Sequence, residues 1–65
     1  MALLDDLMAA QRQVFDLQQE GKAMTAPEVR RAMNRLMGLL RQATPADLAA
    51  FTAWKNEEQR RRAAP

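Results

Sequence analysis

The residue types that carry most enzyme chemistry are missing from this chain. It contains no His, Cys, Ser or Tyr, so a disulfide is excluded, and the usual nucleophile–base pairs and the usual zinc ligands are missing. Eight carboxylates remain, and among them Asp5 adjoins Asp6 and Glu57 adjoins Glu58. Adjacent residues on a helix point about 100° apart, so neither pair converges on a substrate or a metal. We interpret them as solvated surface charges, and the sequence predicts a protein that is not an enzyme and holds no cofactor or metal.

Arginines form the second group that could do chemistry, because guanidinium groups neutralise phosphates. Arg30, Arg31 and Arg35 lie close together, Arg41 follows, and a run of three arginines occupies positions 60–62. Acidic residues are interleaved with them, and the formal net charge is only +2. A small basic DNA- or RNA-binding regulatory protein is therefore the alternative function, with Arg30, Arg31 and Arg35 as its nucleic-acid contacts.

Large apolar side chains that could bind another protein gather in the last third of the chain. Leu48, Phe51 and Trp54 recur every three residues, which places them on one face of a helix. No fourth helix is expected that could share this stripe, so we predict that these three residues form the protein-binding surface. Trp54 is the predicted anchor, since Trp is enriched at binding hot spots. Packing of the same stripe into a core stays open.

Methionines are the other adaptable apolar residues. Met8, Met24, Met33 and Met37 lie within or beside the expected helices. A flexible thioether fills irregular gaps in a core and also lines grooves that accept a partner protein. The sequence leaves both roles open, with core filling as the default.

The first element expected to position these residues is an amphipathic helix over about residues 2–20. Its apolar residues are spaced 4-3-4-3, the seven-residue repeat typical of coiled coils. This stripe consists of Leu3, Leu7, Ala10, Val14 and Leu17. Gly21 follows at the place where a helix often ends in a left-handed cap.

A second amphipathic helix is expected over about residues 25–43. Thr25 is the predicted cap, Glu28 would complete a capping box, and Pro27 lies in the first turn. The 4-3-4-3 spacing recurs here. This stripe consists of Val29, Met33, Leu36, Leu40 and Ala43. Gly38 inside the helix marks either a close helix crossing or a tolerated glycine.

A third helix is expected over about residues 45–61. Thr44 would cap it, Pro45 would occupy its first position and Asp47 its third. Residues 55–62 are entirely polar, so we expect the last two turns to project into solvent or to fray.

These elements predict an all-α fold in a single domain, 1–65: an antiparallel helical hairpin with a third helix folded back or extended. Residues 1–20 hold four carboxylates and one arginine, whereas residues 21–43 hold five basic residues and one glutamate, so the hairpin flanks attract. A chain this short buries only about 60% of its unfolded surface. Without disulfides or a metal, a dimeric helical bundle is the expected remedy. The predicted homodimer interface comprises Leu7, Val14, Met33, Leu36 and Leu40.

The cellular location is indicated only by features that the sequence lacks. No run of about 18 apolar residues could span a bilayer. The first ten residues carry Asp5 and Asp6 where a signal peptide would carry Lys or Arg. The sequence therefore predicts a cytoplasmic protein without a membrane segment.

In size, in richness in Ala, Arg and Gln, and in its two- or three-helix plan, the chain resembles small phage-encoded helical proteins that bind host regulators, of the quorum-sensing antagonist type. It is also similar to helical-hairpin co-chaperones of secretion systems. Both resemblances cover the whole length and lie in size and composition, so no functional residue is carried over. They imply a small protein-binding inhibitor or adaptor whose partner is a protein such as a host regulator.

Overall fold

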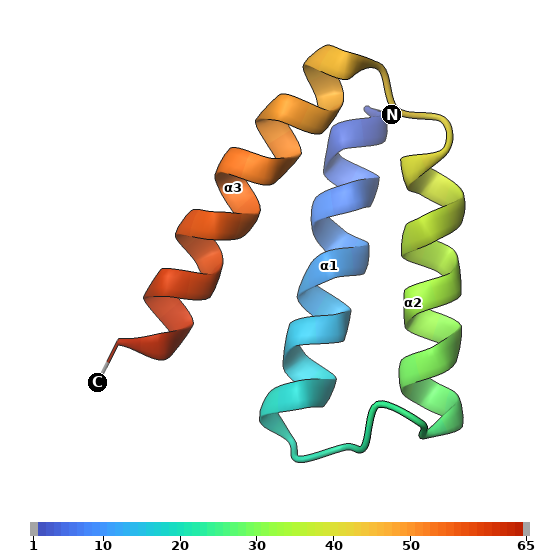
Figure 1. Cartoon of the computed structure of the whole chain (residues 1–65), viewed down its shortest axis with the longest axis vertical. Helices are drawn as coiled ribbons and strands as arrows, with labels where there is room; N and C mark the ends of the chain where they lie inside the picture. The colour runs from blue at the N-terminus through green and yellow to red at the C-terminus, as the bar shows by residue number, and fades with distance from the viewer. Residues whose placement is uncertain (1, 65) are drawn as a thin grey trace.

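A computed structural model describes residues 2–64 of the chain. It contains three helices and, in this range, no strand: α1 (Leu3–Gln19), α2 (Pro27–Leu40) and α3 (Pro45–Ala63) (Figure 1). The predicted all-α class is confirmed.

The three helices lie side by side with α1 in the middle (Figure 1). The helix α1 packs against α2 on one side and α3 on the other, while α2 and α3 scarcely touch. The molecule measures 32 × 29 × 17 Å, so its shortest dimension is little more than half of either of the others. The hairpin of α1 and α2 is antiparallel, and α3 returns alongside α1 in the same direction. In this arrangement α1 has helical neighbours on two sides.

The core runs along α1. The seams predicted for the first two helices face each other within one chain, and α3 adds one aromatic ring. The buried core cluster consists of Leu7, Ala10, Val14, Ala32, Leu36 and Phe51.

The turn after α1 forms as the glycine predicts. Gly21 has a positive φ of 82°, the only positive φ found among the described residues. The N–H of Gly21 donates to the carbonyl of Gln18 at 3.0 Å, and that of Lys22 donates to Leu17 at 3.1 Å. These two bonds are the Schellman arrangement, which satisfies the last carbonyl groups of the helix.

The predicted start of α2 is wrong by two residues. Ala26, not Thr25, is the cap, and its side chain offers no hydrogen bond. The cause is Pro27, whose ring forces the preceding residue out of the helical region. Ala26 accordingly adopts φ −62° and ψ 141°, which leaves Thr25 too far back to reach the first turn.

The predicted end of α2 is also wrong, because the helix stops at Leu40. Gln42 and Ala43 donate to carbonyls only three residues back, which tightens the chain into a turn. Thr44 must be extended because it precedes Pro45, so the helix has to end before it. A Cβ at Gly38 would meet no atom within 4 Å, so Gly38 does not mark a close helix crossing.

The start of α3 is confirmed. Thr44 Oγ1 accepts from the N–H of Asp47 at 3.1 Å, and the N–H of Thr44 donates to Asp47 Oδ2 at 3.3 Å. This is a complete capping box, with Pro45 at the first helical position. Two of the orphan N–H groups at this end are therefore satisfied by side chains.

The expectations for the end of α3 are wrong. The helix continues to Ala63, and Glu58, interpreted as a solvated surface charge, is only 5% exposed. Arg62 reaches across to Asp16 of α1 with a nitrogen–oxygen distance of 2.8 Å. The last turns are thus held against α1 by charge pairs, which a count of apolar residues does not reveal.

Candidate binding groove

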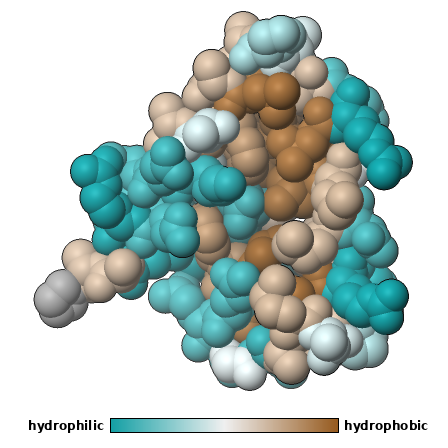
Figure 2. All heavy atoms as spheres, in the orientation of Figure 1, coloured by the Kyte–Doolittle hydropathy of each residue, from teal (hydrophilic) through white to brown (hydrophobic). Residues whose placement is uncertain are grey.

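A groove of about 370 Å³ runs along the open face of α1. The helix α1 forms its floor, and α2 and α3 form its walls. Figure 2 looks onto this face, where hydrophobic residues gather along the middle and hydrophilic residues lie on both sides. We call it the α1 groove.

The wall on α2 is apolar. Met33, Met37 and Leu40 line it, and they follow one another at helical spacings of four and three residues. Met37 is 49% exposed, so the wall is open to a ligand. At the lower end Met24, 54% exposed, receives a hydrogen bond on its sulfur from the Gln18 amide at 3.4 Å. Of the two roles that the sequence leaves open, the structure places Met24, Met33 and Met37 along the groove.

The floor and the opposite wall mix apolar and polar groups. Val14 and Phe15 lie on the floor, and Phe51 of α3 adds its ring to the wall. Lys55 and Gln59, one and two turns further along α3, bring an ammonium and an amide to the same wall. The groove is therefore asymmetric, with thioethers on one side and polar ends on the other.

Gln11 is a buried polar residue on the groove floor. It is only 7% exposed, yet its amide makes no hydrogen bond to any of residues 2–64. No side-chain nitrogen or oxygen of a non-exposed residue in this range is both enclosed and unpaired, so the amide keeps access to the groove. The amide of Gln11 thus offers a hydrogen-bond donor and an acceptor on the floor of the groove, next to apolar side chains.

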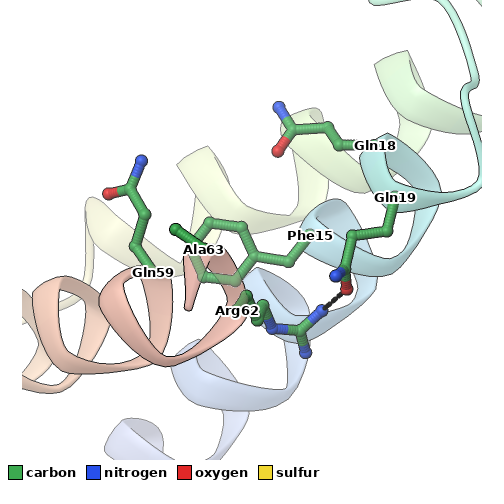
Figure 3. A pocket seen from close by; sticks show the side chains of 6 residues that line it. All are labelled: Phe15, Gln18, Gln19, Gln59, Arg62 and Ala63. Carbon is green, nitrogen blue, oxygen red and sulfur yellow. Dashed lines mark hydrogen bonds between the residues drawn. The ribbon is translucent and has the colours of Figure 1, made fainter. Parts of the chain in front are cut away.

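The groove continues into a smaller hollow of about 250 Å³ between the last turns of α1 and α3 (Figure 3). Phe15, Gln18 and Gln59 line both spaces. Arg62 lies beside this hollow, with its guanidinium 5.2 Å from the centre of the Phe15 ring and hydrogen-bonded to Gln19.

Arg62 also belongs to an ionic cluster that fastens α3 to α1. Its Nε donates to Glu58 at 3.0 Å, and Arg61 donates to the same carboxylate. The hydrogen bond from Arg61 lowers the pKa of Glu58, although desolvation by burial opposes this, and Arg62 adds to the lowering. In turn, the hydrogen bond to Asp16 raises the pKa of Arg62. Both groups are charged at neutral pH.

The arginines of α3 and those around α2 differ in their pairing. Each of the three at the end of α3 pairs with a carboxylate: Arg60 with Glu57, Arg61 with Glu58, and Arg62 with Glu58 and Asp16. In contrast, four arginines on or next to α2 have no carboxylate of residues 2–64 within 4.0 Å of their guanidinium groups. These four are Arg30, Arg31, Arg35 and Arg41.

The residues predicted to form a protein-binding stripe differ in burial in the structure. Phe51 is buried in the core at 4% exposure, so for this residue the alternative of core packing holds and its assignment to an open binding surface is wrong. Trp54 is partly buried against the core, with the Arg12 guanidinium 5.4 Å above its ring. Only Leu48, 40% exposed, offers open apolar surface. The cause is that α1 covers this stripe, which leaves the α1 groove as the larger apolar surface.

The predicted dimer residues are divided as well. Leu7, Val14 and Leu36 are buried between α1 and α2 of one chain, at 0%, 2% and 5% exposure. Met33 and Leu40 are half-buried and line the α1 groove. Two of the five residues are therefore placed where a second copy could reach them.

The predicted nucleic-acid contacts are all exposed. Arg30 lies three residues before Met33, on the groove side of α2. Arg31 and Arg35 lie about 100° or more further round the helix, toward its solvent face. The three arginines therefore do not form one patch.

Sequence reasoning missed Gln11, Lys55 and Glu58. Each lies at core spacing from a buried residue: Gln11 is four residues after Leu7, and Lys55 and Glu58 are four and seven residues after Phe51. A polar residue at the spacing of buried residues is the feature of the sequence that marks these three positions. It indicates a side chain that is either paired inside the fold or reserved for a ligand.

No protein-family model, no curated protein and no solved structure matches this chain. Within residues 2–64, no group of three or more metal-binding side chains comes together. No helix in that range is both long and apolar enough to cross a bilayer.

Proposed function

We propose that this chain is a small protein-binding module that receives a segment of a partner protein in the α1 groove. The observation that carries the proposal is the open methionine wall of α2 facing the floor of α1, with no part of residues 2–64 covering it. Met37 and Met24 are 49% and 54% exposed, so they offer apolar surface that a partner could bury.

The chemistry of the walls favours a protein segment over a small molecule. A small-molecule site encloses most of its ligand, whereas this groove is open between two helices that scarcely touch. Methionine side chains adapt their shape to a partner and are over-used at protein-binding surfaces. A peptide helix laid along α1 would complete the missing layer of the fold.

A module of this kind acts by occupying a surface of its partner, as an inhibitor or an adaptor, and is not an enzyme. The absence of His, Cys, Ser and Tyr supports this. The resemblance to phage-encoded inhibitors supports a cytoplasmic partner such as a host regulator. A homodimer through Met33 and Leu40 is the rival use of the same groove.

The test is a pull-down of the partner with the wild-type chain and with two matched variants. Met37→Asp places a charge in the groove wall, whereas Leu48→Asp places the same charge on exposed apolar surface outside it. We expect Met37→Asp to abolish capture, Leu48→Asp to leave it intact, and wild-type capture to survive moderate salt because apolar contacts dominate. Loss of capture with Leu48→Asp alone would instead support the stripe of α3.

One observation supports the alternative of nucleic-acid binding: the four arginines around α2 have no carboxylate partner within residues 2–64. A nucleic-acid binder would lose affinity steeply and log-linearly with salt. In that case Arg31→Ala and Arg35→Ala would weaken binding, whereas Met37→Asp would have little effect.

A further inference from the structure

The margins of the α1 groove carry cations that nothing in the described chain neutralises. Arg30, Met33, Met37 and Arg41 are spaced by three, four and four residues, so they share one strip of the α2 surface. An arginine therefore stands at each end of the methionine wall, about 16 Å apart along the helix. Both side chains are exposed, and neither has a carboxylate within 4.0 Å among residues 2–64.

The opposite margin is positive too. Lys55 lines the α3 wall, and its ammonium has no carboxylate within 4.0 Å in the same range. The acidic groups of α1 do not reach this face. Asp16, for example, lies about 160° round the helix from Gln18 on the groove floor, and it is engaged by Arg62.

The dimensions of the groove suit two turns of an incoming helix. Its lining extends from Met33 to Leu40 on α2 and from Gln11 to Gln18 on α1, each about 10 Å at 1.5 Å per residue. A helix would present apolar side chains at positions i, i+3 or i+4, and i+7 over this length. The residues beside that stripe would then face Arg30 and Arg41 on one side and Lys55 on the other.

From these placements we propose that the α1 groove accepts an amphipathic α-helix of a partner protein whose apolar stripe is flanked by Asp or Glu. This rests on the proposed function and names the chemistry of the partner. The methionine wall contacts the apolar stripe of the partner helix. Arg30, Arg41 and Lys55 at the margins of the groove pair with its acidic flanks. The free amide of Gln11 meets one hydrogen-bonding side chain within the stripe, which fixes its register.

A second copy of this chain fits the same site less well. Two grooves facing each other across a two-fold axis would bring identical cationic margins together, and like charges across an interface are unfavourable. A nucleic acid fits less well again, since phosphates would leave the methionine wall uncovered and Arg31 and Arg35 face away from the groove.

The experiment selects helices against the whole chain. A displayed library of helical peptides of about 18 residues carries a fixed Leu/Met stripe, with the flanking positions drawn from Asp, Glu, Lys, Arg and Ser. We expect selection to enrich Asp and Glu at the flanks. The Arg30→Glu/Arg41→Glu variant should weaken the best helix by about tenfold or more, and Arg31→Glu/Arg35→Glu, with the same change of charge outside the groove, by less than about threefold.

The outcomes separate the inference from the function on which it rests. Helices that lose binding with Met37→Asp but show no acidic preference would overturn the inference and keep the groove as a protein-binding site. Failure to enrich any helix above the Met37→Asp background would overturn both. Self-association that Met37→Asp abolishes would assign the groove to a second copy. Binding of a short DNA duplex that weakens most with Arg31→Glu/Arg35→Glu would assign the surface to nucleic acid.

Discussion

The helices α2 and α3 flank the same central helix and both begin at a proline, yet they are attached to it in different ways. The helix α2 buries three apolar side chains, Val29, Ala32 and Leu36. The helix α3 buries one aromatic ring, Phe51, and the carboxylate of Glu58. The arginines of α2 have no carboxylate within 4.0 Å among residues 2–64, whereas Arg62 of α3 pairs with Asp16 and so links α3 to α1.

This difference assigns two roles to different helices: the charges of α3 hold the fold together, and the exposed side chains of α2 serve a ligand. Because packing alone holds α2 against α1, its methionines and arginines are free to serve a ligand. The position of α3 depends on the pairs among Glu58, Arg62 and Asp16, so those charges are committed to the fold. Charge that is paired within the chain is weak evidence for a binding site, and unpaired charge beside an open apolar wall is stronger evidence.

The largest effect should come from the single aromatic anchor of α3. Phe51→Ala removes most of a side chain that is 4% exposed, a change that costs about 3–4 kcal/mol in a core. Roughly 3–10 kcal/mol is the whole stability expected for a chain of this size. We therefore expect this variant to lose about a third or more of the free energy of unfolding, as measured by urea titration of the helical circular dichroism.

Leu48→Ala is the matched control, because Leu48 lies one turn earlier on α3 and is 40% exposed. Its free energy of unfolding should stay within about 0.5 kcal/mol of the wild type. If Phe51→Ala were equally mild, α3 would not be anchored on α1 and the groove would lose one wall.

A smaller effect should distinguish the two proline-initiated starts. Thr44→Ala removes the capping box of α3 and should cost about 1 kcal/mol. Ala26→Ser gives α2 the side-chain cap that it lacks and should stabilise by about the same amount. Thermal unfolding of the two variants beside the wild type measures both changes. A loss of about 1 kcal/mol from Thr25→Ala, or no gain from Ala26→Ser, would contradict the assigned caps.

The smallest effect is local and depends on pH. Since the pKa of Glu58 is lowered from its usual value of 4.5, its contribution to docking the end of α3 is complete above about pH 4.5. That contribution is lost as the pH falls through the lowered pKa, because the protonated carboxyl no longer pairs with the arginines. We expect residues 57–63 to loosen in acid while α2 stays folded, as reported by backbone carbon chemical shifts.

Glu58→Gln sharpens that test, since the amide keeps the shape of the side chain and cannot titrate. In this variant the end of α3 should be loose at neutral pH, and its chemical shifts should lose the acid transition. Glu57→Gln is the control, because Glu57 pairs only with exposed Arg60 and is itself exposed. Equal behaviour of the two variants would show that burial of Glu58 does not matter.

The sequence was most informative where the local backbone decides the outcome. The three helices follow from their apolar spacing, and the turn at Gly21 follows from its freedom to adopt a positive φ. The error at Thr25 was avoidable, because the restriction that Pro45 places on Thr44 applies equally to Pro27 and Ala26. The steric constraint that a proline places on the preceding residue outweighs the preference of Thr for the cap position.

The groove could not be predicted in the same way. Its walls exist because α3 packs on the side of α1 away from α2, and the apolar spacing of α3 is compatible with either side. Arg62 links α3 to Asp16 of α1 and also pairs with Glu58, but charged residues in a polar stretch are interpreted as solvated until such a contact with α1 is known. Core filling, the default for both methionines, therefore holds in part for Met33, which packs against the core from the edge of the groove, and is wrong for Met37, which is 49% exposed.

The most direct test of the groove uses its own methionines. In the chain with 13C-labelled methionine methyl groups, Met24, Met33 and Met37 report on the groove, whereas Met8 on α1 lies outside its lining and serves as the internal control. On titration with the helix selected above, the signals of Met33 and Met37 should shift and saturate together while that of Met8 stays in place. A shift confined to Met8, or an unchanged spectrum in the presence of a helix shown to bind by another method, would contradict the central claim that the α1 groove is the binding surface.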